Sequence, residues 1–365
     1  MRKRALLLPG SLGMGHDVMA EAWATSLRSR GWSTRTMDAM RLLGRTGGSA
    51  GETVFRSMLA IPGLYDAYHF ATLRTGNRLA RLTDAAARSQ LVPRLRQYLD
   101  ANPADLVVSV FATAASAVSR IHGRYPDMAH VVFCTDVTPH RLWVHKHTDL
   151  YLVTSHVAEC AVQRFDPEAE IAVVPAPVRP TFYDPPTQEE ARARFGVPAT
   201  ERCVLIMSGA WGLGPLATTA AALSRAGLHV LAVAGRNAKL EHRLREAGAR
   251  HPRLHPFGFT DRVPDLMAAS DLVITTSGDT CTEARVVGRH VLLLDVVPGH
   301  GRDNLQHELE LGGASVTSAR PADVVRTTLS ALDHVKPAPS GATRTPADWE
   351  TALTAALTRI GLGSC

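Results

Sequence analysis

The sequence has few cysteines, few aromatic residues and no long hydrophobic run. Its five cysteines form no CxxC pair and leave an odd count, so we expect neither a disulfide framework nor a zinc site, and a reducing compartment fits. No hydrophobic run approaches the ~20 residues that cross a bilayer. The hydrophobic stretch after Arg4 stops at Pro9, too early for a signal peptide. We therefore expect a cytoplasmic protein that meets a membrane, if at all, at its inner face and peripherally.

The amino-acid composition of the chain is that of a globular α/β protein. Of the 365 residues, 45% are hydrophobic and 20% are charged, while only 5% are aromatic. The formal net charge of +6 suits an anionic partner, such as a phosphorylated substrate or a membrane surface. No DNA- or RNA-reading module is visible, so we expect no nucleic acid partner.

Short runs of Val, Leu and Ile alternate with segments of helical period. This pattern predicts parallel sheets that are covered by helices on both faces. The expected strands form two series, at 5–8, 106–110, 131–134, 150–153 and 171–174, and then at 204–207, 230–233, 272–275 and 291–294. Two series predict two Rossmann-like, doubly wound domains. Prolines at 175–186 place the boundary, giving an N-terminal domain at 1–176, a second domain at 177–335, and a linker with a final helix at 336–365 that packs back on the first domain.

A glycine-rich turn, Gly10 to Gly15, follows the first expected strand and ends in His16. Such a turn allows close approach of a ligand to the backbone, and the helix that we expect from about Val18 would favour negative charge at its start. A histidine at the carboxyl end of a strand projects into the crevice where these folds bind ligands. The alternative is a surface or helix-capping histidine.

Polar residues also follow the expected strand at 131–134. Asp136, His140 and Trp143 share this loop, which could orient a sugar or an acceptor hydroxyl. The alternative is a capping aspartate and a structural tryptophan.

The second series of strands is followed by comparable turns. The segment at 208–216 is rich in glycine, and its backbone N–H groups could hold a diphosphate without a metal ion. Ser277, Gly278 and Thr280 follow the strand at 272–275 and lead into a helix that contains Glu283. A carboxylate there could accept hydrogen bonds from the two ribose hydroxyls, and the alternative is a simple helix cap.

The segment at 53–96 mixes bulky hydrophobic and basic side chains. This mixture suits peripheral contact with an anionic lipid surface. Helices that cover the sheet with solvated arginines are the alternative.

Taken in order, these motifs resemble the diacylglycerol glycosyltransferases, which are the monogalactosyldiacylglycerol synthases and the bacterial processive diacylglycerol glucosyltransferases. The chain is more distantly similar to the N-acetylglucosaminyltransferase that forms lipid II. The motifs are GxGH at 13–16, TDxxxHxxWV at 135–144, PxRPxF at 177–182, GAxG at 209–212, GF at 258–259, GxTxTEA at 278–284, and a Pro-Gly pair at 298–299 with Asn304 downstream.

The resemblance implies a GT-B fold with a cleft between two domains, and inverting transfer of a sugar from a UDP-sugar, or another nucleotide sugar, to an acceptor hydroxyl. The acceptor would be a diacylglycerol-type lipid or a specialised-metabolite core, which would place the enzyme in glycolipid or natural-product biosynthesis. It also implies the site residues. The catalytic base would be His16, with Asp136 as runner-up. Acceptor contacts would come from Gly13, Gly15, His140 and Trp143. Donor contacts would come from Gly209, Ala210, Trp211, Gly212, Gly258, Phe259, Ser277, Gly278, Thr280, Glu283, His300, Gly301 and Asn304.

The chemistry agrees with these roles. Histidine has the unperturbed pKa closest to neutrality, as a general base requires. Fixed backbone dipoles could stabilise the departing diphosphate, so we expect no metal ion and no other cofactor.

The chain departs from the family pattern at one place. His300-Gly301 stands where the family has a Gln-Glu pair that contacts hydroxyls of the donor sugar. Glycine cannot replace a carboxylate, so the sugar could differ from glucose or galactose, and Arg302 or Asp303 could take over part of the contact. A UDP-sugar epimerase and a non-catalytic sugar-nucleotide-binding protein are the alternative functions.

Overall fold

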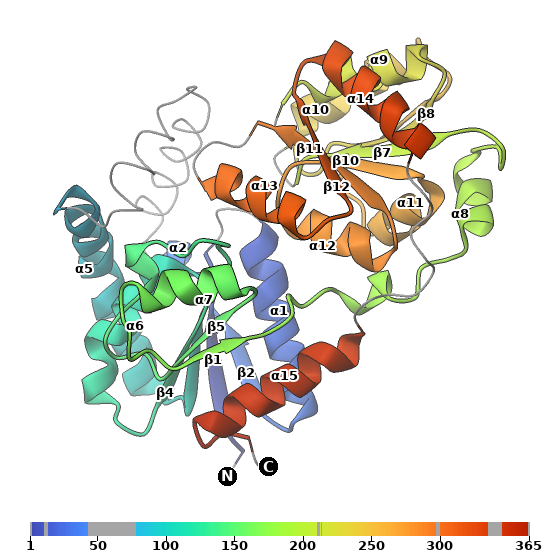
Figure 1. Ribbon diagram of the computed structural model, residues 1–365. Coiled ribbons are helices and arrows are strands. Elements are labelled where there is room, and N and C mark those ends of the chain that lie inside the picture. Colours follow the sequence, from blue (N-terminus) through green and yellow to red (C-terminus); the bar gives the residue numbers. More distant parts are fainter. Residues whose placement is uncertain are drawn as a thin grey trace. The chain divides into compact units, whose positions relative to one another are not determined.

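The computed structural model describes residues 2–10, 14–42, 78–209, 212, 214–296, 300–334 and 345–363 (Figure 1). The chain divides into two compact units. Unit 1 is built mainly from Met1–Pro177 and Ala347–Cys365, and unit 2 mainly from Val178–Val297 and Gly301–Pro346. Each unit contains a six-stranded parallel sheet.

The sheet of unit 1 has the strand order β2-β1-β3-β4-β5-β6. Its strands are β1 (Arg4–Leu8), β2 (Ser33–Thr36), β3 (Leu106–Ser109), β4 (Ala129–Phe133), β5 (Leu150–Val153) and β6 (Ile171–Val173). Its helices are α1 (Met14–Ser29), α2 (Ala39–Leu42), α5 (Arg78–Ala101), α6 (Ala112–Ile121), α7 (His156–Gln163) and α15 (Pro346–Arg359), with short 3₁₀ turns η2 (His122–Arg124) and η3 (Arg141–Trp143). The chain reverses its direction of winding between β1 and β3. In open α/β sheets ligands bind at the carboxyl ends of the strands, next to such a reversal.

The sheet of unit 2 has the order β12-β11-β10-β7-β8-β9, with its reversal between β7 and β10. Its strands are β7 (Cys203–Met207), β8 (His229–Val233), β9 (Leu254–Phe257), β10 (Leu272–Thr275), β11 (His290–Asp295) and β12 (Ala314–Ser318). The 3₁₀ turn η4 (Pro180–Phe182) precedes its helices, α8 (Gln188–Phe195), α9 (Leu216–Arg225), α10 (Ala238–Gly248), α11 (Val263–Ala269), α12 (Asp279–Val286), α13 (His300–Glu310) and α14 (Pro321–His334).

Alternate residues of each strand pack into two separate hydrophobic layers, because successive side chains of a strand point to opposite faces of the sheet. In unit 2, Leu205 packs under α8, α11 and α12, whereas its neighbours Val204 and Ile206 pack under α9, α10 and α14. Burial on both faces explains why the central strands are continuous hydrophobic runs.

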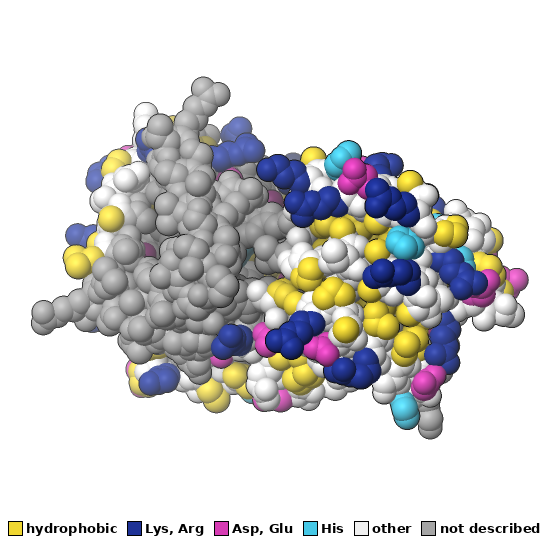
Figure 2. All heavy atoms as spheres, turned by 90° about the horizontal axis from the view of Figure 1, so that it is seen from above, with side chains coloured by type: hydrophobic (Ala, Val, Ile, Leu, Met, Phe, Trp, Pro, Cys, Tyr) yellow, Lys and Arg dark blue, Asp and Glu magenta, His cyan; other side chains and the backbone are white. Residues whose placement is uncertain are grey.

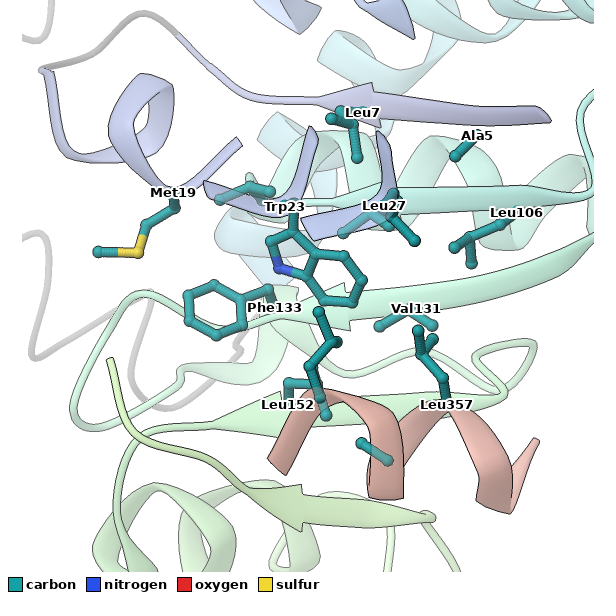
Figure 3. Close-up of a cluster of buried hydrophobic side chains, with 14 of the residues drawn as sticks. Ala5, Leu7, Met19, Trp23, Leu27, Leu106, Val131, Phe133, Leu152 and Leu357 are labelled. Carbon is teal, nitrogen blue, oxygen red and sulfur yellow. The ribbon is translucent and has the colours of Figure 1, made fainter. Parts of the chain in front are cut away.

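The C-terminal helix α15 belongs to the core of unit 1. Trp349 of α15 lies edge-to-face against Trp23 of α1 and against Phe133 of β4, with ring centroids 5.9 and 6.0 Å apart. Its Nε1 donates a hydrogen bond of 2.9 Å to the Ser26 hydroxyl. Figure 3 shows the same cluster from within, with Leu357 of α15 facing Trp23 and Val131. Helix α15 therefore closes one face of the sheet.

The nine strands expected from the sequence are all present, but three others were not predicted. These are β2, β9 and β12, and each lies at an edge of its sheet. These three edge strands lack the hydrophobic run that marks a buried strand, whereas β6, which is also at an edge, has such a run and was predicted. Helix α1 also begins at Met14 rather than near Val18, which places His16 in its first turn.

No helix in the described part of the chain is long and hydrophobic enough to cross a bilayer.

Candidate active site

His16 lies beside the reversal point of the unit 1 sheet. Its Nδ1 is 2.6 Å from the carbonyl oxygen of Val110, the residue that follows β3. A carbonyl oxygen can only accept, so Nδ1 carries the proton in this contact and the lone pair of the neutral ring is on Nε2. Within the described residues, Nε2 has no hydrogen-bond partner. His16 is therefore oriented as a proton acceptor.

A ring contact fixes the other side of the imidazole. Phe111 lies edge-to-face against His16, with centroids 5.7 Å apart. The Phe111 ring in turn fills the space above Gly10, where an added Cβ would lie 2.5 Å from the ring. Gly10 is thus required by packing next to the candidate base, which the sequence pattern did not reveal.

Asp136, His140 and Trp143 form one hydrogen-bonded cluster after β4. The buried Trp143 donates from Nε1 to Asp136 Oδ2 over 2.9 Å, and His140 Nε2 lies 3.7 Å from the same oxygen. His140 Nδ1 accepts from the backbone N–H of Leu142, so its ring proton is on Nε2 and faces the carboxylate. These contacts give Asp136 a place in orienting the loop.

A second group of residues gathers at the carboxyl edge of the unit 2 sheet. Gly209 follows β7 with φ of 54°, a left-handed conformation that favours glycine, and space is open where its side chain would be. Gly212 is also left-handed, with φ of 60°, and a side chain there would in addition collide with Leu240 of α10. The turn therefore exposes backbone next to the reversal point.

The start of α12 lies after β10, beside this turn in the strand order. Its N-cap is Gly278, which supplies no side-chain cap and has open space where a Cβ would be. No N-cap side chain therefore occupies the start of α12, where the backbone N–H groups of a helix favour an anion. Ser277 donates from its hydroxyl to the backbone carbonyl of Gly301 over 2.9 Å, which joins the starts of α12 and α13.

Glu283 is buried in α12 and is held by Arg179. Arg179 Nη2 donates to Glu283 Oε1 over 3.1 Å, and the carboxyl is only 10% exposed. Burial raises the pKa of the Glu283 carboxyl to about 7, although the charge of Arg179 acts in the opposite direction. Sequence reasoning placed Arg179 in the PxRPxF motif but gave it no contact with Glu283.

Gly258 and Phe259 follow β9. A Cβ on Gly258 would lie 2.5 Å from the Glu241 carboxylate, so this position is closely packed against α10. The Phe259 ring is 57% exposed, and the guanidinium of Arg236 lies over it at 5.0 Å. The two side chains form an exposed flat surface that can stack on a planar ring.

Several predicted positions lie outside the described residues. They are Gly13, Ala210 and Trp211, together with the side chain of His300. Asn304 in α13 is described and half-buried, and its buried Oδ1 accepts no hydrogen bond within the described part of the chain. Gly15 precedes His16 in the first turn of α1.

The predicted membrane-contact segment at 53–96 is described only from residue 78 onward. Within that part Arg88 is not simply solvated, because it donates to Asp84 and to Ser116 inside the fold.

Unit 2 carries its own concentration of charge: residues 236–253 contain six Lys or Arg and two Glu. Basic side chains are interspersed with hydrophobic ones on the face of unit 2 that Figure 2 shows. No three His, Cys, Asp or Glu side chains among the described residues are arranged to hold a metal ion.

Comparison with known proteins links the chain to lipid glycosyltransferases. Residues 52–173 match the family model of monogalactosyldiacylglycerol (MGDG) synthase. The chain is 29% identical over 203 residues to a processive diacylglycerol beta-glucosyltransferase of Bacillus pumilus, covering 54% of this chain and 53% of that one. It is 28% identical over 338 residues to a probable chloroplastic monogalactosyldiacylglycerol synthase of Nicotiana tabacum, covering 85% of this chain and 61% of that one. The chain thus spans about half to three fifths of the length of these two relatives.

The fold is shared with solved glycosyltransferase structures. The sucrose-phosphate synthase of Thermosynechococcus elongatus aligns with a TM-score of 0.59 at 14% identity, covering 100% of this chain and 95% of that one. At this identity the likeness concerns the fold alone. The chain has the GT-B fold, and its sequence is similar to those of the monogalactosyldiacylglycerol synthases and processive diacylglycerol glucosyltransferases.

Proposed function

We propose that the chain is an inverting glycosyltransferase that moves a sugar from a UDP-sugar to a hydroxyl of a diacylglycerol-type lipid. The relatives named above support the class of reaction and the lipid acceptor. The observation that carries the proposal is the contact of His16 Nδ1 with the Val110 carbonyl, which leaves Nε2 as the proton acceptor. An inverting transfer needs one such base on the acceptor side.

In the proposed reaction, His16 Nε2 takes the proton of the acceptor hydroxyl while its oxygen attacks C1 of the donor sugar. The bond between C1 and the diphosphate oxygen breaks, and the diphosphate leaves with the electron pair. The imidazolium keeps its Nδ1–H bond to Val110, whose carbonyl dipole favours the positive charge. A single displacement inverts the anomeric carbon.

The donor is assigned to the carboxyl edge of the unit 2 sheet. The backbone at Gly209 and the uncapped start of α12 would receive the diphosphate, since both offer N–H groups to an anion. Glu283 would accept from the ribose hydroxyls, and the base would stack near Phe259. These fixed dipoles are proposed to stabilise the leaving group without a metal ion, so activity should survive EDTA.

The identity of the sugar depends on the segment at His300-Gly301. The Gly301 carbonyl already accepts from Ser277, and glycine brings no carboxylate to a sugar hydroxyl. The donor panel should therefore include UDP-glucose, UDP-galactose and UDP-N-acetylglucosamine. A specialised-metabolite core is the other acceptor class, and contact of residues 53–96 with the membrane would accompany a lipid acceptor.

The test is an assay of the purified chain with each UDP-sugar and with diacylglycerol in mixed vesicles. We expect mass spectrometry to find a glycosylated lipid, and NMR to find the anomeric configuration opposite to that of the donor. Product on a soluble acceptor but not on diacylglycerol would overturn the lipid assignment. A retained configuration would overturn the single displacement, and conversion of the UDP-sugar to an epimer without acceptor would overturn the transferase reaction.

A further inference from the structure

Arg179 and Glu283 form an ion pair between residues 104 positions apart in the chain. Arg179 precedes η4, and its guanidinium lies over the ring of Phe182 at 4.8 Å. Phe182 is fully buried in the core of unit 2, so it anchors the arginine. Arg179 is thus held at the Glu283 carboxyl by the fold, although its side chain is 40% exposed.

The pair leaves one carboxylate oxygen available. Arg179 binds Oε1, whereas Oε2 accepts no hydrogen bond within the described residues. A carboxylate offers about four lone-pair sites, so Oε2 and the remaining site on Oε1 can accept from two hydroxyls on adjacent carbons. A protonated Glu283 could accept fewer hydrogen bonds, because one of its oxygens would carry the proton and act as a donor.

Two charged groups act on Glu283 in the described part of the chain. Arg179 favours its ionised form, and Asp279, at the start of the same helix, opposes it. Burial opposes ionisation more strongly than either, and the pKa of Glu283 is about 7. Without Arg179, burial and Asp279 would both act against the carboxylate.

We propose that Arg179 is a positioning residue for donor binding, which keeps Glu283 ionised and turned so that it accepts from the ribose 2′ and 3′ hydroxyls. This inference rests on the proposed function, and it adds a residue that acts through Glu283 without touching the nucleotide. Binding of a ribonucleotide should then depend on pH through Glu283, and Arg179 should set the pH at which affinity is lost.

The experiment measures the affinity of the full chain for UDP and for 2′-deoxy-UDP by calorimetry between pH 6 and pH 9. For the native chain we expect UDP to bind more tightly than 2′-deoxy-UDP, with affinity falling below about pH 7. Arg179→Gln should move that pH midpoint upward by about one to one and a half pH units and weaken UDP binding at pH 7 about five- to fifteenfold. Most of this loss should be recovered at pH 9, and Arg179→Lys should restore much of the native profile.

Three further variants separate a positioning role from a structural one. In a Glu283→Gln background, Arg179→Gln should cause little additional loss, because the group through which it acts is absent. Arg194→Gln is the matched control, since Arg194 pairs with Asp265 over 3.1 Å in the same unit and lies on α8. It should leave UDP affinity and its pH profile unchanged. Thermal unfolding without nucleotide should confirm that each variant is folded.

The outcomes distinguish this inference from the proposed function. If the native chain binds no UDP, or if Glu283→Gln keeps full discrimination against 2′-deoxy-UDP, the donor assignment itself fails. Suppose instead that the native chain binds UDP and that Glu283→Gln loses the discrimination. If the loss in Arg179→Gln is then the same at every pH, or adds fully to that of Glu283→Gln, Arg179 is not a positioning residue for Glu283.

Discussion

His16 and Val110 are joined by a 2.6 Å contact between Nδ1 and a backbone carbonyl, although they are 94 residues apart in sequence. The contact joins the first turn of α1, which follows β1, to the residue after β3. Strands β1 and β3 are neighbours because the sheet reverses between them. It selects the tautomer of the imidazole without using an acidic side chain.

His16→Ala should therefore lower turnover by about 10²- to 10⁴-fold, since it removes the general base. UDP affinity should change little, because the donor is assigned to unit 2. Product formation and calorimetric UDP binding check the two parts. His156→Ala is the control, as His156 is an 85% exposed histidine of the same unit. Near-native turnover in His16→Ala would show that His16 is not the general base.

Gly10→Ala should disturb the same centre without altering a polar group. The added methyl would lie 2.5 Å from Phe111, whose ring supports His16. We expect a loss of about 1–3 kcal/mol in the free energy of unfolding, together with reduced turnover. Gly123→Ala, where a Cβ meets nothing within 4 Å, should have neither effect. Urea unfolding and initial rates provide the measurement, and native behaviour of Gly10→Ala would show that Phe111 moves aside freely.

The Trp143–Asp136 hydrogen bond should appear as an energetic coupling. Trp143→Phe keeps most of the buried ring but removes the Nε1 donor. A double-mutant cycle with Asp136→Asn should give a coupling of about 1–3 kcal/mol in unfolding free energy. The matched control is the same cycle with Trp23→Phe in place of Trp143→Phe. Trp23 is fully buried, and its Nε1 has no hydrogen-bond partner among the described residues. A coupling no larger than that of the control would mean that Asp136 does not depend on Trp143.

Stability should fall on the acid side because of His130. Burial lowers the pKa of His130 to about 3, whereas the unfolded chain takes up the proton near pH 6.5. The folded chain therefore holds His130 in its neutral form. The resulting contribution to the free energy of unfolding is complete above pH 6.5 and is lost progressively as pH falls toward 3. Burial likewise lowers the pKa of His145 to about 4, so it acts in the same direction.

His130→Asn should reduce this pH dependence by up to about 1.4 kcal/mol per pH unit between pH 4 and 6, even if the variant is less stable overall. Urea unfolding at several pH values measures the slope. His156→Ala should leave the slope close to native. An unchanged slope in His130→Asn would show that His130 does not remain neutral in the folded chain.

The central strands, and the edge at which polar motifs gather, can be predicted from the sequence alone. Buried central strands need hydrophobic side chains on both faces, and the residues that follow parallel strands meet at one edge of the sheet. For that reason the sequence places His16, Asp136, Gly209 and Ser277 shortly after predicted strands, and Glu283 in the helix that follows one of them. Helix α8 also begins at a local sequence signal, since Thr187 and Glu190 form a capping box.

The contacts that those residues make depend on the fold and cannot be predicted from the sequence. Strands β2, β9 and β12 are short or polar edge strands, and only their pairing with a neighbour identifies them. The contacts of His16 with Val110 and of Arg179 with Glu283 join distant segments, and no local pattern of residues encodes such a distance. The raised pKa of Glu283 likewise follows from how deeply α12 is packed, because the free energy of a charge depends on its surroundings rather than on its place in the sequence.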